Sequence, residues 1–196
     1  VGPMQNFSYI VEDESTHEAI VIDPSWDLEK LTEIINEQNL NPKYIVNTHW
    51  HDDHTRGNED LAKELSVKIV QHSASQLKND LTVSDGDSIK FGCSELAVYH
   101  TPGHSKDSIC LVGDGKIFSG DTLFVGNCGR IDLPGGSARE LYHSLSDVIA
   151  NLSDDLVLYP GHDYGSSPTS TIGSEKRTNF VMQKVSEAEF VERMGG

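Results

Sequence analysis

The amino-acid sequence predicts a layered α/β domain, and three observations lead to this fold class. Short runs rich in β-branched and aromatic residues recur at strand length, and most are flanked by Gly, Pro, Asp or Asn. Amphipathic helical patterns lie between some of these runs. The 196 residues contain no internal repeat, low-complexity tract or linker. Because a chain of this length suits one domain with a substantial core, we expect residues 1–196 to form a single domain.

Eight strands are expected along the chain. The dipeptide Asp114-Gly115 separates two of them, and Asp-Gly favours the tight turn of a β-hairpin. The expected strands cover residues 9–11, 19–22, 44–46, 68–70, 96–99, 109–112, 116–118 and 156–159.

Three helices are expected between and after these strands. Residues 27–40 and 137–152 repeat apolar residues at helical spacing. The second of these helices, and a short third one over residues 186–194, each begin with a Ser placed three residues before a Glu. This is the spacing of a capping box, which marks the start of a helix.

Charge and composition exclude several classes of partner. The chain has 15 basic and 31 acidic residues, a formal net charge of −16, which disfavours nucleic acid and anionic membranes because both need positive charge. No apolar run approaches the roughly 20 residues of a membrane span, and we expect no signal peptide. The three cysteines stand at unrelated spacings, so we expect no disulfide framework and a cytoplasmic location.

The segment VNTHWHDDHTRGN, residues 46–58, contains the strongest functional signal. Three histidines and two aspartates fall within positions 49 to 54. Two histidines at i and i+2 of an extended segment, His49 and His51, can face the same ion, and imidazole is a good ligand for zinc and other first-row metals. A turn would then direct Asp53 and His54 toward a second ion. The pattern therefore predicts two neighbouring metal positions.

Further candidate ligands follow the ends of later expected strands. They are His104, Asp121 and His162. Asp121 is suited to bridge the two ions, because a carboxylate has two oxygens. Two ions about 4 Å apart generate hydroxide at neutral pH and polarise an electrophile. The residues thus predict a catalytic metal centre.

These segments resemble the motifs of the metallo-β-lactamase superfamily. THWHDDH is similar to its H-x-H-x-D-H motif, and TPGHS, SGDTLF and YPGHDYG are similar to its later motifs, in the same order. The resemblance covers nearly the whole chain and implies a four-layer αββα sandwich with a dinuclear site at one edge. By position, it implies that the first metal binds His49, His51, His104 and Asp121, and that the second binds Asp53, His54, Asp121 and His162.

Within the superfamily, GDTLFVGNCGR at residues 120–130 is similar to glyoxalase II, the hydroxyacylglutathione hydrolase. The resemblance implies a thioesterase that uses metal-bound hydroxide on an acyl-thiol such as S-lactoylglutathione, with Asp53 and Asp121 as catalytic residues. It implies two divalent ions, zinc first, with iron or manganese as alternatives. Positions that correspond to thiol-carrier contacts are Arg130, Tyr164, Lys176 and Arg177.

Other functions remain open at this point. The chain also resembles persulfide dioxygenases, which hold one ferrous ion with two histidines and one aspartate at the positions of His49, His104 and Asp121. Their arginine after the bridging aspartate is absent here. A promiscuous β-lactamase or lactonase and a non-enzymatic metal or redox module are further alternatives.

Overall fold

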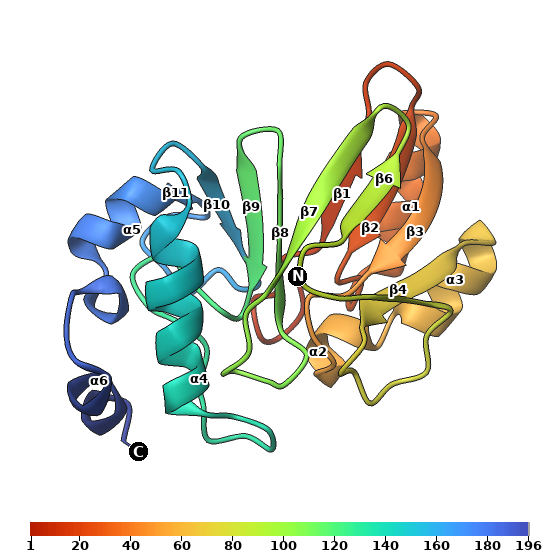
Figure 1. Ribbon diagram of the computed structural model, residues 1–196. Helices are drawn as coiled ribbons and strands as arrows, with labels where there is room; N and C mark the ends of the chain where they lie inside the picture. The colour runs from red at the N-terminus through yellow and green to blue at the C-terminus, as the bar shows by residue number, and fades with distance from the viewer. Residues whose placement is uncertain (196) are drawn as a thin grey trace.

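The computed structural model describes residues 1–195, which form two mixed β-sheets packed face to face (Figure 1). The strands of the first sheet follow the order β1-β2-β3-β4-β5. In this sheet β1 and β2 are antiparallel, and the other neighbours are parallel. Its elements are β1 (Tyr9–Glu12), β2 (Glu18–Ile22), α1 (Leu28–Glu37), β3 (Asn41–Val46), α2 (Asp52–Thr55), α3 (Asn58–Leu65), β4 (Lys68–His72) and β5 (Leu81–Val83).

The second sheet follows the order β11-β10-β9-β8-β7-β6. It is antiparallel except between β9 and β10. Its strands are β6 (Ser88–Phe91), β7 (Ser94–His100), β8 (Ile109–Gly113), β9 (Lys116–Gly120), β10 (Val157–Pro160) and β11 (Ser170–Thr171). Its helical segments are α4 (Ala138–His143), η1 (Ser144–Val148), η2 (Ile149–Asn151), α5 (Ile172–Thr178), η3 (Phe180–Met182) and α6 (Glu187–Arg193).

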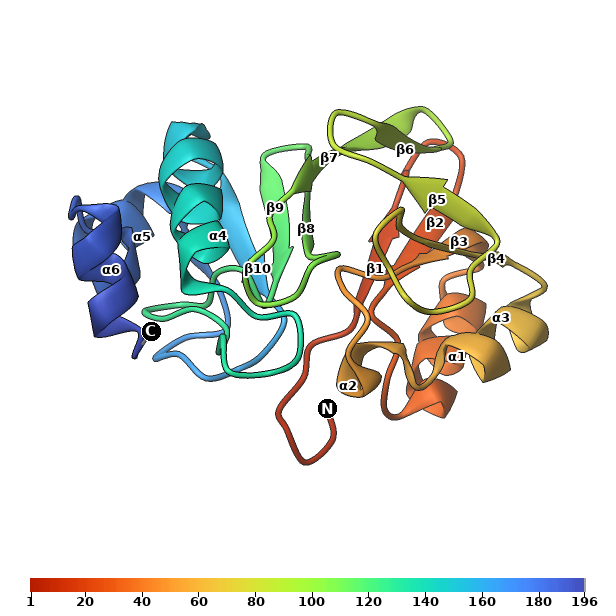
Figure 2. The same ribbon diagram turned by 60° about the horizontal axis from the view of Figure 1, so that its bottom comes forward.

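Three apolar clusters hold four layers together. The alternation of side chains along β2 explains how one strand serves two clusters, since Ile20 and Ile22 point between the sheets while Ala19 and Val21 point toward the helices. A third cluster, which includes Leu141 and Leu145, packs the second sheet against its own helices. Helices therefore cover both outer faces, as Figure 2 shows. This arrangement confirms the predicted αββα sandwich.

The eight expected strands are all present, and so is the hairpin turn between β8 and β9. Asp114 and Gly115 both have positive φ, 46° and 69°, as a tight two-residue turn requires. The expected helix over residues 137–152 is present, but its middle widens into a π-helix and its end tightens into a 3₁₀-helix. At the two capping boxes, the hydroxyls of Ser137 and Ser186 accept the expected backbone N–H groups.

Some elements were not predicted from the sequence. Strands β5 and β11 have only three and two residues, and α2 has four, too few to show a periodic pattern. Strand β6 does alternate, with Ile89 and Phe91 buried between exposed neighbours, and it was detectable from this pattern. Among the described residues, the structure has no helix that is both long and apolar enough to cross a membrane.

Candidate metal centre

All seven predicted ligands converge in one small region. Three overlapping groups of donor atoms form there, and within each group the atoms lie no more than 4.8 Å from one another. The loops after β3, β7, β9 and β10 bring these residues together from distant parts of the chain. The groups are His49, His51 and His104; His49, His54 and Asp121; and Asp53, His54 and His162.

The carboxylate of Asp121 joins the two ends of this region. Its Oδ1 lies 3.3 Å from Nε2 of His54, and its Oδ2 lies 3.3 Å from Nε2 of His162. The same Oδ2 lies 3.5 Å from Nε2 of His104, on the other side. Asp121 therefore lies where one carboxylate reaches both predicted metal positions.

The second position is as compact as the first. His51 Nδ1 lies 2.9 Å from His104 Nε2 at one end, and His54 Nε2 lies 3.2 Å from His162 Nε2 at the other. Asp53 Oδ2 is the carboxylate donor at the second metal position, 3.5 Å from His54 Nε2 and 3.4 Å from His162 Nε2. Both predicted metal positions thus have imidazole and carboxylate donors.

Unpaired polar atoms indicate that these donors fit a metal. Within residues 1–195, four buried side-chain atoms have no hydrogen-bond partner, and three of them belong to predicted ligands: His49 Nε2, His51 Nε2 and Asp121 Oδ1. Buried polar atoms are normally paired, so such a cluster of exceptions needs a reason. Divalent ions supply one for His49 Nε2 and Asp121 Oδ1, because imidazole and carboxylate are the donors that first-row metals prefer. His51 presents its other nitrogen, Nδ1, to His104.

Metal binding needs neutral imidazole and ionised carboxylate, and His49, His51 and Asp121 meet this condition. Against the effect of burial, Asp121 raises the pKa of His54 and His162, so a metal has to displace a proton from each of these two. Burial, with the nearby His54, lowers the pKa of His49 well below its usual value. Burial and His104 lower the pKa of His51 to about 4. Burial opposes ionisation of Asp121, but His54 and His162 outweigh it and hold the pKa of Asp121 well below its usual value.

Local backbone structure separates the two halves of the HWHDDH run. His51 is extended, with φ −61° and ψ 145°, and α2 begins at the next residue. The helical turn then places Asp53 and His54 beside His162, while the His54 ring also lies beside that of His49, with centroids 4.2 Å apart. Gly161 is required nearby, because a Cβ at this position would lie 2.4 Å from Oδ1 of Asp121.

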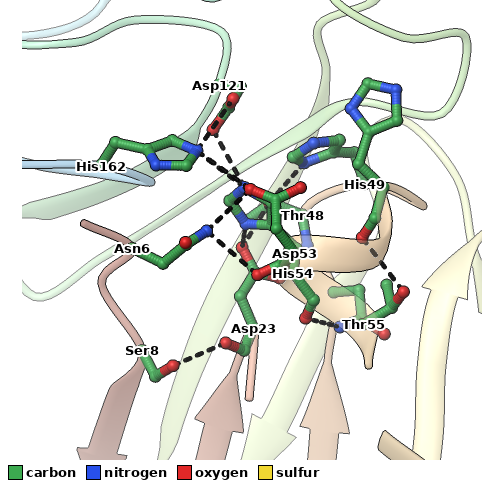
Figure 3. Close-up of polar contacts among 12 residues, drawn as sticks. Asn6, Ser8, Asp23, Thr48, His49, Asp53, His54, Thr55, Asp121 and His162 are labelled. Carbon is green, nitrogen blue, oxygen red and sulfur yellow. Dashed lines mark hydrogen bonds and ion pairs between the residues drawn. The ribbon is translucent and has the colours of Figure 1, made fainter. Parts of the chain in front are cut away.

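Other residues orient the histidine ligands, and sequence reasoning missed them. The carboxylate of Asp23 lies 3.0 Å from Nδ1 of His54 and accepts hydrogen bonds from the backbone N–H and the hydroxyl of Thr48 (Figure 3). Nδ1 of His104 faces the Arg130 carbonyl at 2.6 Å, and Nδ1 of His162 faces the Met4 carbonyl at 2.7 Å. Such contacts set the tautomer and leave Nε2 free for a metal.

A cavity of about 480 Å³ opens onto the ligands. Met4, Phe124, Leu133 and Tyr164 give it a partly apolar wall, and the Tyr164 ring stacks on His162 with centroids 4.6 Å apart. The structure thus brings Tyr164 to the site. It brings Arg130 there too, and Arg130 is the one Lys or Arg among the described residues that line this cavity.

Lys176 and Arg177 do not line this cavity. Both lie on α5, and the ammonium group of Lys176 donates to the Leu152 carbonyl and to Asp154 at 2.8 and 2.6 Å. Lys176 lines a separate cavity, beside Tyr142. The structure therefore gives these two residues no contact with the metal region, and their role in substrate binding stays a prediction.

Comparisons with known proteins agree with the geometry. The model of the metallo-beta-lactamase superfamily matches residues 1–162. The chain is 32% identical to a probable polyketide biosynthesis zinc-dependent hydrolase, PksB of Bacillus subtilis, with 95% of this chain and 85% of that protein covered. It is 37% identical to the human mitochondrial persulfide dioxygenase ETHE1 (96% and 76% covered) and 34% identical to a hydroxyacylglutathione hydrolase of Tolumonas auensis (98% and 76%).

A solved structure extends the similarity to three dimensions. The crystal structure of ETHE1 from Myxococcus xanthus superposes with a TM-score of 0.93 at 32% identity, covering 98% of this chain and 86% of that one. Members of this family bind divalent metals, and most are enzymes. From its motifs, its αββα layers and its converged ligands, this chain belongs to the metallo-β-lactamase superfamily.

Proposed function

We propose that the protein is a two-metal hydrolase of acyl-thiols, with zinc as its first-choice metal. The observation that carries this proposal is the position of Asp121, whose carboxylate lies within 3.5 Å of His104 at the first position and of His54 and His162 at the second. A site with two adjacent positions and ligands for both is suited to hydrolysis. The similarity to a hydroxyacylglutathione hydrolase and to a zinc-dependent hydrolase supports the same reaction class.

The bound ions would lower the pKa of water and polarise the thioester carbonyl. The side chains of the protein would position the water and enclose the substrate. Asp53 would orient the attacking water by accepting a hydrogen bond from it at a carboxylate oxygen, while the hydrogen bonds from Asn6 keep Asp53 in place. Met4, Phe124 and Leu133 would exclude bulk water around the acyl group, and Tyr164 would pack along the thiol portion. A thiolate leaves readily, so the reaction needs no strong general acid.

Persulfide oxygenation is the second candidate, and two observations favour it. His49, His104 and Asp121 supply a two-histidine, one-carboxylate set of the kind that non-haem iron oxygenases use. ETHE1 proteins are also among the chain's similar relatives and structures. Against this candidate, Val125, Gly126 and Asn127 follow the Asp121 motif where those enzymes carry an arginine.

A single panel separates the two reactions. Metal-free protein is loaded separately with zinc, manganese and ferrous iron, and each form is assayed for thioester hydrolysis and for oxygen consumption with glutathione persulfide. We expect thioester hydrolysis with zinc and no oxygen uptake with any metal. Oxygen uptake confined to the ferrous form, without thioester hydrolysis, would establish the second candidate instead. A β-lactam and a lactone in the same panel test the remaining hydrolase alternatives.

A further inference from the structure

The segment before β1 runs along the metal edge of the sandwich beside α2 (Figure 2). Asn6 lies in this segment, 1% exposed, and its backbone forms a bridge with His162. Phe7 N–H donates to the Gly161 carbonyl at 2.8 Å, and Asp163 N–H donates to the Gln5 carbonyl at 2.9 Å. The segment is thus attached to the loop that carries one ligand, with the Asn6 side chain directed at another.

The Asn6 amide makes two hydrogen bonds to Asp53. Its Nδ2 donates to the Asp53 carbonyl at 3.0 Å and to Asp53 Oδ2 at 2.9 Å (Figure 3). Oδ2 is the carboxylate oxygen that faces His54 and His162. Asn6 therefore contacts the oxygen placed to bind the second ion, and it leaves that oxygen a further lone pair.

The orientation of this amide is determined by a third contact. The indole Nε1–H of Trp26 donates to Oδ1 of Asn6 at 3.2 Å, and an indole can only donate. Turning the amide over would set its NH₂ against the indole N–H and its oxygen against two acceptors of Asp53, leaving buried groups unpaired. Trp26 is itself covered by the Arg56 guanidinium, whose carbon lies 4.0 Å from the ring centroid.

We propose that Asn6 is a positioning residue for the second metal, and that it holds the Asp53 carboxylate in the direction the ion requires. Asp53 lies in the first turn of a four-residue helix, and the Asn6 amide restrains its carboxylate from outside that helix. In a variant that lacks the Asn6 side chain, an ion that binds Asp53 must also order the carboxylate, and this costs binding free energy. Loss of a contact of this kind lowers metal affinity on the order of 10–100-fold.

The proposal shares the second metal position with the proposed function, but the test is a binding measurement and does not depend on which reaction the site performs. Metal-free protein is titrated with zinc against a chromophoric chelator, which yields stepwise dissociation constants. The titration of Asp53→Ala identifies the step that belongs to the second ion. For Asn6→Ala we expect that same step to weaken on the order of 10–100-fold and the other to stay unchanged.

Two further variants test whether a general folding defect could explain a weaker second step in Asn6→Ala. Trp26→Phe keeps the ring beneath Arg56 but removes the indole donor, so it should weaken the same step by a smaller factor. Ser8→Ala removes the hydrogen bond from this segment to the Asp23 carbonyl, makes no ligand contact, and should leave the second step unchanged. Cobalt titrations followed by visible spectra should show the same spectrum for the first ion in all three variants.

Three results would overturn the proposal. Unchanged constants in Asn6→Ala would mean that Asp53 needs no such support. Equal weakening of both steps would assign Asn6 to general support of the fold. Binding of only one ion by the parent protein would remove the second position altogether.

Discussion

Arg130 donates two hydrogen bonds, each 2.6 Å long, to the two carboxylate oxygens of Asp132. Both side chains are 64% exposed. Arg130 is the one Lys or Arg among the described residues at the metal cavity, so a substrate carboxylate has to compete with Asp132 for it. Exposed ion pairs contribute at most about 1 kcal/mol, so this competition is weak enough for a substrate to overcome.

The first prediction concerns this pair. Arg130→Ala should raise KM for the anionic S-lactoylglutathione, whereas Asp132→Asn should lower it, each by roughly two- to fivefold, because the guanidinium is lost in one variant and released in the other. A neutral thioester of N-acetylcysteamine should be hydrolysed as before by both. If hydrolysis of the two thioesters is impaired equally in Arg130→Ala, Arg130 supports the fold or the metal centre instead.

The second prediction compares two ligands of the same centre. Asp121→Ala should lose more metal and more activity than His162→Ala, because Asp121 contacts donors of both positions and His162 those of one. We expect His162→Ala to retain about one ion per chain and Asp121→Ala less than that. Metal content after dialysis against a defined zinc buffer is the measurement. Equal retention by the two variants would argue against a bridging carboxylate.

The third prediction concerns the stability that Asp23 supplies. Asp23→Ala leaves two buried donors of Thr48 and one ring nitrogen of His54 without their partner. At 1–3 kcal/mol for each unsatisfied group, we expect the free energy of unfolding of the metal-free protein to fall by about 3 kcal/mol or more. Urea unfolding measures it, with the exposed Asp155→Ala as the control. A loss no larger than that of the control would mean that Thr48 and His54 find other partners.

The fourth prediction is a pH dependence away from the metal. His72 is 6% exposed and stacks on His100 with ring centroids 4.0 Å apart. Burial and His100 lower the pKa of His72 to about 4, from 6.5. Between these two pH values the unfolded chain binds the proton and the folded chain does not, so stability rises with pH in this window.

The contribution of His72 to the free energy of unfolding is therefore complete above pH 6.5 and is lost as the pH falls toward 4. His72→Gln should flatten the rise in unfolding free energy across this range, relative to the parent protein. Urea unfolding of both metal-free proteins at several pH values tests this. Parallel pH profiles would show that His72 titrates alike in the folded and unfolded chains.

Much of the candidate site was predictable from the sequence, because its strongest signal is local. The ligands of residues 49–54 are neighbours in the chain, and an extended pair followed by a helical turn changes the backbone direction between them. His104, Asp121 and His162 follow strand ends, and the order of their motifs resembles that of one superfamily. The layers were predictable for a similar reason, since apolar alternation and helical spacing are properties of short segments.

Contacts between distant residues were decided only by the tertiary structure. Asn6 is 47 residues from Asp53, and Asp23 is 31 residues from His54, and no periodicity marks either pair. The structure likewise determined that Arg130 pairs with Asp132 and that Lys176 is bound to Asp154, away from the metal. The physical reason is the same in each case: residue types and spacing indicate which groups can bind a metal or a carboxylate, whereas packing of the whole chain selects which partner each group meets.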